Sequence, residues 1–462
     1  MPKRLAFLAL LVPALLFAES AAPARPPHQV LARDIYRELI ELNTTGKYGA
    51  TAAAVAMQTR LKAAGFTDQE LILAGPTPAA QCLIIRLHGR GEQKPILFLG
   101  HLDVVEALPS DWTTDPFKLV EKDGYFYGRG TMDMKDGVTA MVVSLIRMKE
   151  AGYVPRGDII VALTDHEEDG GDNGAIWLAQ QHRDWIDAAY GINPDGGSGT
   201  LKNGRPVVLE FQTAEKTYVG IDLEVTNPGG HGSVPTKDNA IYRLAAGLGR
   251  LAAYDFPLNL NETTRTYFAR SATQESGQTK ADMLAVGETG DPAAAGRLAA
   301  ANPFFNALMR TTCVATQLQA GHAENALPQT ARATLNARVL PTEKPEEIRA
   351  TLERILADPQ IKITRFQAYP GGPLSPIEPK LFAKVEQLAG ARWPGVTVVP
   401  FMGTGATDSV HFRNIGIPVY GLSGAFLNFN EHRAHGKDER LGVQEFYDSV
   451  DFMYDLMRKL TE

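Results

Sequence analysis

The sequence predicts an α/β protein with a doubly wound, mostly parallel sheet and an inserted, smaller ferredoxin-like α+β layer. Three observations lead to this prediction. Strand-like and helix-like stretches alternate up to about residue 214, the order changes to β-α-β-β-α-β over residues 215–370, and the first pattern resumes after residue 370. Strands that alternate with helices form a parallel sheet covered on both faces. The chain has 462 residues, which favours two domains over one.

The first part of the larger domain, residues 25–214, carries apolar runs bounded by turn residues. They predict the strands 80–87, 96–100, 159–164 and 189–192, and the helices 26–45, 52–64 and 141–149. In a sheet of this type, ligands bind beyond the carboxyl ends of the strands. Three of the predicted strands are followed at this edge by His101, Glu167 and Asp195.

The inserted layer, residues 215–370, has the strand and helix order of a split βαβ unit. The predicted strands are 218–226, 312–319, 331–339 and 362–368, and the predicted helices are 239–251 and 346–356. Residues 255–309 are too long for a structureless loop, so we expect further elements there. The strands 396–402 and 418–422 return the chain to the larger sheet, in a second part that covers residues 371–462.

Residues 1–24 have the layout of a secretory signal peptide. Lys3 and Arg4 precede an apolar segment at 5–17, and small residues follow it. The segment is shorter than the roughly 20 apolar residues of a membrane-spanning helix, so we expect no stable membrane span after its removal, although a short anchor is the alternative. No cysteine lies near the cleavage zone, which argues against a lipid anchor. We therefore expect an exported protein, either periplasmic or secreted.

Charge and cysteine content exclude several other classes. The net charge is −7 and no dense Lys/Arg run is present, so we expect no nucleic-acid partner. Cys82 and Cys313 are the only cysteines, and both lie in strand-like runs. We predict two buried thiols rather than a disulfide, since a core of this size does not need one.

Histidine and carboxylate residues gather at the predicted sheet edge. His101 is followed two residues later by Asp103, a carboxylate able to hold the second ring nitrogen of a metal-binding histidine. Asp133 closes a glycine-rich run that begins at Gly128. Each residue also has a non-functional interpretation: His101 could be a loop histidine with Asp103 as a chance neighbour, and Asp133 could be an ordinary helix cap.

Further candidate residues occur later in the chain. Glu167 and Glu168 are adjacent acids after an apolar strand, and holding both ionised at a partly buried edge calls for a cation. Asp195 lies in a Pro-Asp-Gly-Gly turn, and His435 lies near the C-terminus with His432 as its competitor. The alternatives are a solvated acidic turn, a simple turn and surface histidines.

Together these residues supply two imidazoles and three carboxylates as candidate metal ligands: His101, Asp133, Glu168, Asp195 and His435. Nitrogen and oxygen ligands suit zinc, with cobalt or manganese as substitutes. Five protein ligands exceed the needs of one four-coordinate catalytic zinc but suit two zinc ions that share a carboxylate and a water. Glu167 would remain free to accept a proton from that water.

An ordered set of five motifs resembles a known family. The motifs are His101-Leu-Asp, Gly128-Arg-Gly-Thr-Met-Asp-Met-Lys, Glu167-Glu, Pro194-Asp-Gly-Gly and His435-Gly-Lys-Asp-Glu. The set is similar to that of the metallopeptidase family that contains acetylornithine deacetylase, succinyl-diaminopimelate desuccinylase and carboxypeptidase S. The resemblance runs from about residue 30 to the C-terminus and implies a zinc-peptidase-like catalytic domain (25–214 and 371–462) with a lid (215–370).

The resemblance also implies a role for each candidate. His101 and Asp195 would hold one zinc, Glu168 and His435 the other, and Asp133 would bridge the two. His435 fits better than His432, because the terminal ligand of the family begins a His-x-x-Asp-Glu run. The chain departs from the common family form at Asp195, where many relatives have Glu, and in its long segment 255–309. Arg310-Thr-Thr and the motif around Asn325 nevertheless favour the carboxypeptidase-S-like branch.

Three lid residues match substrate-contacting positions of the family. His231, in Asn-Pro-Gly-Gly-His-Gly, matches a histidine that helps to stabilise the oxyanion, often across a homodimer formed through the lid. Asn325 and Arg338 match further substrate contacts, and an Arg is a natural fork for a carboxylate. The alternatives are a surface loop, a turn-stabilising amide and a structural ion pair. The loop 403–408, which ends at Asp408, resembles a substrate-side loop, with a simple turn as its alternative.

These inferences lead to one predicted function. The protein is expected to be an exported, zinc-dependent exopeptidase that cleaves a small peptide or N-acyl amino acid next to a free carboxylate. Glu167 would be the general base towards a zinc-bridged water, and Asp103 would orient His101. An N-acyl-amino-acid deacylase (aminoacylase) and a non-catalytic peptide-binding protein are the alternatives.

Overall fold

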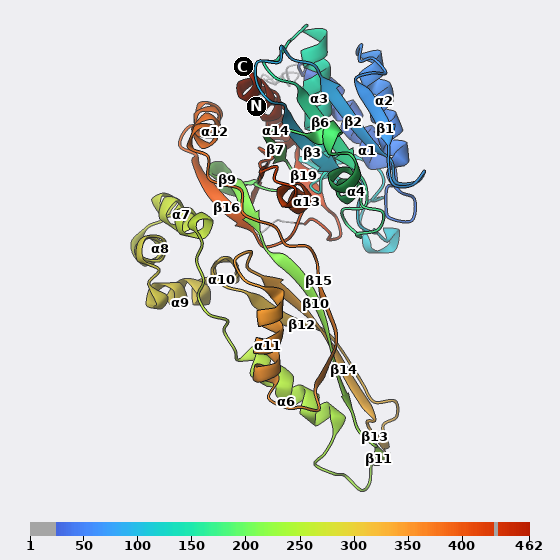
Figure 1. Cartoon of the computed structure of the whole chain (residues 1–462), viewed down its shortest axis with the longest axis vertical. Coiled ribbons are helices and arrows are strands. Elements are labelled where there is room, and N and C mark those ends of the chain that lie inside the picture. Colours follow the sequence, from blue (N-terminus) through green and yellow to red (C-terminus); the bar gives the residue numbers. More distant parts are fainter. Residues whose placement is uncertain (1–24, 429–432) are drawn as a thin grey trace, which may run out of the picture.

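The structure, a computed structural model, describes residues 25–428 and 433–462. A ten-stranded sheet forms its larger part (Figure 1). The spatial order is β1 (Leu71–Ala74), β2 (Cys82–Leu87), β6 (Ile159–Thr164), β3 (Ile96–His101), β7 (Tyr190–Asn193), β17 (Val419–Gly421), β9 (Arg205–Glu215), β8 (Gly199–Lys202) and β18 (Phe426–Asn428), with β16 (Thr397–Gly403) paired to β9. The central run β6-β3-β7-β17 is parallel, which confirms the predicted sheet.

Helices cover both faces of this sheet. One face packs against α1 (Pro27–Glu41), α2 (Thr51–Ala63), α3 (Lys135–Glu150), α12 (Pro379–Arg392) and α14 (Val443–Thr461). The other packs against α4 (Gly174–Gln181), α5 (Arg183–Ile186) and α13 (Ser409–Asn414). Within β3, Phe98 faces the first group and Leu97 and Leu99 face the second, because successive strand side chains point to opposite faces.

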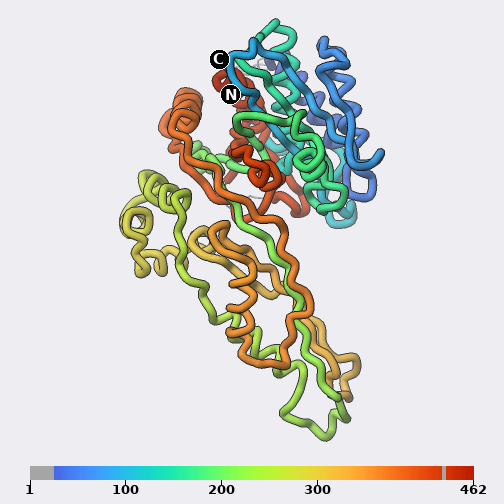
Figure 2. Tube along the Cα trace, in the orientation of Figure 1, coloured from blue at the N-terminus to red at the C-terminus, as the bar shows by residue number. Residues whose placement is uncertain are grey.

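The smaller sheet has the order β12 (Thr312–Ala320), β14 (Thr330–Val339), β10 (Thr217–Thr226) and β15 (Lys362–Ala368), with antiparallel pairing throughout. The helices α6 (Ala240–Ala252) and α11 (Pro345–Leu356) pack on one face of it. This is the predicted ferredoxin-like layer. The chain enters it from β9 and leaves it through β15, and the layer extends away from the larger part (Figure 2).

Two small sheets complete the strands of the described residues. β11 (Gly230–His231) pairs with β13 (Ala326–Leu327) at the far end of the smaller layer (Figure 1). β19 (Arg440–Gly442), β5 (Tyr125–Tyr127) and β4 (Val120–Lys122) form a three-stranded sheet. β19 lies just beyond the turn that carries His435, so this small sheet helps to set where that turn lies.

The segment 255–309 contains four helices: α7 (Glu262–Ser271), α8 (Gly277–Thr289), α9 (Pro292–Ala301) and α10 (Pro303–Met309). They form a hydrophobic cluster with Val399 and Phe401 of β16, so they cover the larger sheet rather than the smaller one. The division of the chain at residues 214 and 370 stays a prediction, and these helices show that part of the inserted segment belongs with the larger sheet.

Some local predictions differ from the structure. α3 begins at Lys135, six residues before the predicted start at 141, because Lys135 and Asp136 are buried polar residues that hide the apolar pattern of the helix. β9 and α14 have no counterpart among the predicted elements. β9 places Gln212 and Glu215 inside the protein, so it lacks the apolar alternation of an ordinary strand.

Cys82 is buried, Cys313 is half-buried, and both are free thiols. The predicted signal peptide, residues 1–24, lies outside the described residues. Within residues 25–428 and 433–462, no helix is both long and apolar enough to cross a membrane.

The helical cluster on β16 yields a stability prediction. Phe268 of α7 is fully buried there, so Phe268→Ala should lower the free energy of unfolding by about 3–5 kcal/mol through lost burial and a cavity. Urea unfolding followed by far-UV circular dichroism measures the change. Tyr242→Ala on α6, where the side chain is 64% exposed, is the control and should stay within about 0.5 kcal/mol of the parent. A similar small change for Phe268→Ala would contradict the packing described.

Candidate metal centre

Three parallel strands end side by side at one edge of the larger sheet and carry most of the predicted site. His101 is the last residue of β3, Glu167 lies three residues beyond β6, and Asp195 lies two residues beyond β7. Asp133 lies in the turn before α3, two residues before its first residue. The strand ends therefore bring together side chains that are far apart in the sequence.

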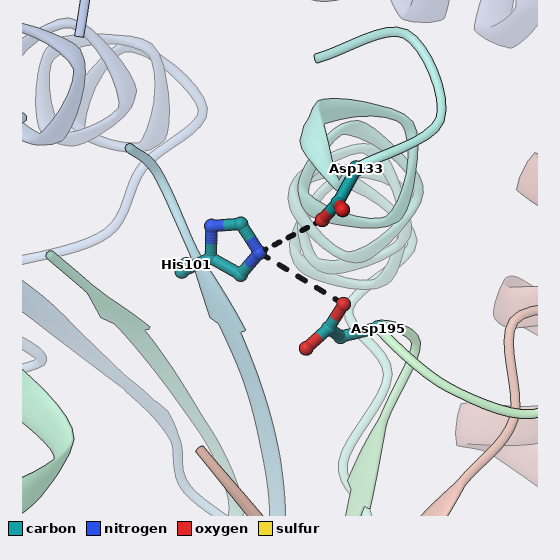
Figure 3. A group of neighbouring side chains, drawn as sticks. All are labelled: His101, Asp133 and Asp195. Atoms are coloured by element: carbon teal, nitrogen blue, oxygen red, sulfur yellow. Dashed lines mark hydrogen bonds and ion pairs between the residues drawn. The ribbon is translucent and has the colours of Figure 1, made fainter. Parts of the chain in front are cut away.

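The first cluster joins His101 to two aspartates. Its Nε2 atom lies 3.1 Å from Asp133 Oδ1 and 3.9 Å from Asp195 Oδ1, and both carboxylates approach the same side of the ring (Figure 3). One nitrogen and two oxygen atoms of these residues lie within 4.8 Å of one another. The three atoms surround a point that a single cation could occupy.

The second cluster uses the other oxygen of Asp133. His435 Nε2 lies 3.0 Å from Asp133 Oδ2 and 2.9 Å from Glu168 Oε2. These ligand atoms also lie within 4.8 Å of one another. Asp133 thus contributes one oxygen to each cluster. The competing His432 lies outside the described residues.

Asp103 connects the first cluster to the Glu167–Glu168 turn. The backbone carbonyl of Asp103 lies 3.0 Å from His101 Nδ1, while its carboxylate accepts the backbone N–H groups of Glu167 at 3.2 Å and Glu168 at 3.0 Å. The carboxylate itself is 3.5 Å from the ring nitrogen. The carbonyl therefore fixes the imidazole, and the carboxylate fixes the turn.

The surrounding carboxylates raise the pKa of both histidines. Burial disfavours the charged form of His101, but hydrogen bonds to the three nearby aspartates outweigh it and hold the pKa well above its ordinary value. Hydrogen bonds to Asp133 and Glu168 raise the pKa of His435 to about 10. The carboxylates that raise these pKa values are the ones that a cation at either cluster would neutralise.

Glu167 has a different environment from its neighbour Glu168. Burial, together with the Asp195 carboxylate, raises the pKa of Glu167 well above its ordinary value. Glu168 contacts His435 and belongs to the second cluster, whereas Glu167 belongs to neither of the two clusters found among the described residues. The two adjacent acids thus have different surroundings, and their roles as ligand and base stay a prediction.

A buried ion pair between Arg129 and Glu439, neither of which is among the predicted site residues, holds the two ligand-bearing loops together. The Glu439 carboxylate, with no exposed surface, accepts hydrogen bonds from Arg129 Nη1 at 2.5 Å and from the backbone N–H groups of Gly130 at 3.2 Å and Met132 at 2.7 Å. Arg129 also donates to the carbonyl of Gly436 at 3.2 Å. The pair joins the loop before Asp133 to the turn after His435. In the sequence, the only sign of this pair is that Arg129 and Glu439 carry opposite charges and each lies within a ligand-bearing motif.

The three predicted lid residues lie in two different regions of the structure. His231 lies on β11, at the end of the molecule farthest from β3, β6 and β7 (Figure 1). The carbonyl of Asn325 accepts a backbone hydrogen bond from Gly232 at 2.7 Å, so Asn325 lies at the same far end. Within one chain, neither residue joins the clusters described above.

Arg338 lies closer to the centre. Its guanidinium lies over the ring of Tyr218 at 4.8 Å, and Tyr218 lies 5.1 Å from Tyr369. A Cβ atom placed on Gly170, next to the Glu167–Glu168 turn, would lie 4.0 Å from the Tyr369 ring. Arg338 therefore belongs to a chain of contacts that ends beside the turn.

The donor chemistry fits two divalent cations. Each cluster offers one imidazole nitrogen and two carboxylate oxygens, and the shared carboxylate supplies one atom to each. Imidazole nitrogens and carboxylate oxygens are ligands that divalent metal ions use in proteins, and the raised pKa values of the histidines have the same cause, the nearby carboxylates.

Comparison with known proteins shows the family of the chain. Residues 97–459 match the family model described as peptidase family M20/M25/M40. The chain belongs to this family. It is 28% identical over 372 residues to the human N-fatty-acyl-amino acid synthase/hydrolase PM20D1, covering 79% of this chain and 74% of the relative. It is 30% identical over 381 residues to the probable carboxypeptidase S-like 2 of Dictyostelium discoideum, covering 79% and 71%.

A solved structure shares the fold. The M20 family metallo-carboxypeptidase Sso-CP2 of Sulfolobus solfataricus superposes with a TM-score of 0.71 at 16% identity, over 92% of this chain and 98% of that one. The predicted family, fold class and hydrolytic class are thus confirmed: the protein is a hydrolase of the metallo-exopeptidase or aminoacylase type.

The raised pKa values of the two histidines yield a metal-binding prediction. Loading zinc onto the metal-free protein at pH 7 should release protons, because cation and proton compete for the same imidazole nitrogens. As His435 has a pKa of about 10, apparent zinc affinity should rise from pH 6 to pH 9 by about tenfold per pH unit for each proton displaced. Calorimetry in buffers of different ionisation enthalpy counts these protons.

His435→Ala provides the matched comparison and should release fewer protons. His182→Ala, which changes a histidine stacked on Trp185 away from the centre, should release as many as the parent. Proton release that is unchanged in His435→Ala would remove this residue from the centre.

Proposed function

We propose that the protein is an exported exopeptidase that hydrolyses a peptide or N-acyl amide bond next to a free carboxylate. The observation that carries the proposal is the pair of three-residue clusters that share Asp133. His101 and Asp195 would hold one cation, and Glu168 and His435 the other. Zinc is the metal that this donor set suits first, with cobalt or manganese as substitutes.

Two cations in this position would lower the pKa of a water and polarise the carbonyl of the scissile bond. Glu167 would accept the proton of the attacking water and pass it to the leaving amine. Its raised pKa supports this role, since a base that also has to act as an acid works best near the operating pH. Asp103 fixes its backbone and so aims it.

The substrate class is proposed from two sources. The names of the two relatives point to N-acyl amino acids and to carboxypeptidase substrates, respectively. Arg338 provides a planar fork for a carboxylate, and its chain of contacts to the Glu167–Glu168 turn supports a position beside the substrate.

His231 and Asn325 would act on a second copy of the chain. They lie at the far end of the lid from the centre that their own chain carries, so an oxyanion contact from His231 requires a homodimer formed through the lid. Export is proposed from residues 1–24 alone.

The aminoacylase alternative would use every residue named above. An aminoacylase would differ in the walls that receive the acyl group. A non-catalytic peptide-binding protein does not account for the presence of five candidate ligands together with a separate buried glutamate.

The role of Glu167 is tested by Glu167→Gln. The variant should bind its full complement of metal and lose about 10²–10⁴-fold in kcat, because the amide cannot take the proton. Metal content by mass spectrometry and turnover are measured on the same sample. Glu347→Gln, on the exposed face of α11, should keep the parent rate. Retained turnover in Glu167→Gln would exclude Glu167 as the base.

The role of Arg338 is tested with paired substrates. Arg338→Lys should raise KM for dipeptides and N-acyl amino acids by about tenfold while kcat changes much less, because lysine keeps the charge and loses the fork. Carboxamide-capped versions of the same substrates should be poor for the parent and equally poor for the variant. Arg349→Lys on the exposed face of α11 is the control. An equal effect on both substrate classes would assign Arg338 a structural role.

A further inference from the structure

Asp408 is a buried carboxylate behind the Glu167–Glu168 turn. It lies immediately before α13 and is 4% exposed. Its Oδ2 atom accepts a hydrogen bond from the Thr164 hydroxyl at 3.0 Å, and its Oδ1 atom accepts one from Asn173 Nδ2 at 2.9 Å. Thr164 ends β6 and Asn173 caps α4, so the two partners flank the turn on both sides along the chain.

The Asn173 amide connects Asp408 to the backbone of the turn. Its Nδ2 atom also donates to the carbonyl of His166 at 3.1 Å, and its Oδ1 atom accepts the backbone N–H of Ile176 at 2.8 Å as the cap of α4. Both amide hydrogens and the amide oxygen are therefore engaged. Because a flipped amide would lose these bonds, Asp408 selects the orientation in which Asn173 holds His166.

His166 occupies a backbone conformation that needs such support. Its φ angle is +61°, in the left-handed region that is unfavourable for a residue with a side chain. The next residue is Glu167, so the direction of the Glu167 side chain depends on this turn. Asp103 already holds the N–H groups of the turn from the side of His101.

The strand that carries His101 is part of the same network. The Thr164 hydroxyl lies 3.3 Å from the carbonyl of Gly100, the residue before His101. The contacts of Asp408 thus reach the ends of both β6 and β3.

We propose that Asp408 is a positioning residue for Glu167, acting through Asn173 and the carbonyl of His166. This inference rests on the proposed role of Glu167 as the base. The hydrogen-bond partners of Asp408 are Thr164 and Asn173, which belong to neither candidate ligand cluster, so its effect is expected on the rate of the chemical step rather than on metal content.

Asp408→Ala removes the acceptor that fixes Asn173. It should lower kcat by about 10- to 100-fold, because a misplacement of about 1 Å at a reacting group costs about that much. KM should change less than about threefold, and metal content should stay at the parent value. Asp184→Ala, on the exposed face of α5, is the control and should keep the parent rate.

Asp408→Asn should recover most of the lost rate. The new amide oxygen can accept from Asn173, and the new amide N–H₂ can donate to the Thr164 hydroxyl, which remains free to donate to Gly100. A buried residue with only a packing role would not distinguish Asn from Ala in this way. An Asn variant as slow as the Ala variant would overturn the proposal.

A double-mutant cycle separates positioning from general stability. In the Glu167→Gln background, Asp408→Ala should reduce kcat by less than about twofold, because no base remains to be aimed. An equal, additive loss in both backgrounds would overturn the proposal. If Glu167→Gln by itself keeps the parent rate, the base assignment fails, which the single variant reveals on its own.

Asn173→Ser is the second variant, for use if Asp408→Ala does not fold. Serine keeps a helix-capping oxygen and removes the amide that links Asp408 to His166. It should show the same loss of kcat with unchanged metal content. Parent-like turnover in this folded variant would overturn the proposal as well.

Discussion

Repulsion between carboxylates is the constraint on which the arrangement of this protein depends. Asp103, Glu167, Glu168 and Asp195 lie just beyond the ends of three neighbouring strands, and Asp133 joins them from the turn before α3. Two like charges 4 Å apart repel by about 4 kcal/mol at an effective dielectric constant near 20, which exceeds the net contribution of a single hydrogen bond. The cluster is therefore stable only with positive charge among the acids, supplied by protonated histidines or by cations.

The surrounding scaffold holds these groups in place with buried polar contacts. Lys135, without exposed surface, donates to the carbonyls of Leu39 at 2.8 Å and Leu42 at 3.0 Å. The Thr44 hydroxyl donates to the carbonyl of Leu102 at 2.7 Å. The N-terminal helix and its following loop are thus attached to both α3 and the strand end that carries His101. A precise metal centre needs such supporting contacts, since the ligand side chains alone do not fix their own backbone.

The lid is arranged differently from the centre. Its sheet leaves the larger part as an extended layer, and His231 lies at the far end. The four helices of residues 262–309 instead cover β9 and β16 and enlarge the core of the hydrolase. A single long insertion therefore has two parts: one packs on the larger sheet, and the other extends away from it as a separate layer.

The sequence by itself determined the fold class and the family, and it indicated the candidate ligands. Apolar strands such as 96–101 end directly before a histidine or an acid, and such local patterns depend on a few neighbouring residues. Only the tertiary structure decided which distant groups support them. Glu439 and Arg129 are 310 residues apart, and Asp408 and Asn173 are 235 apart. The start of α3 was hidden for the same reason, because Lys135 and Asp136 look solvent-exposed in the sequence and become buried when α1 and the sheet close around them. Contacts of this kind depend on how the chain is routed through the sheet, and no short stretch of residues encodes that route.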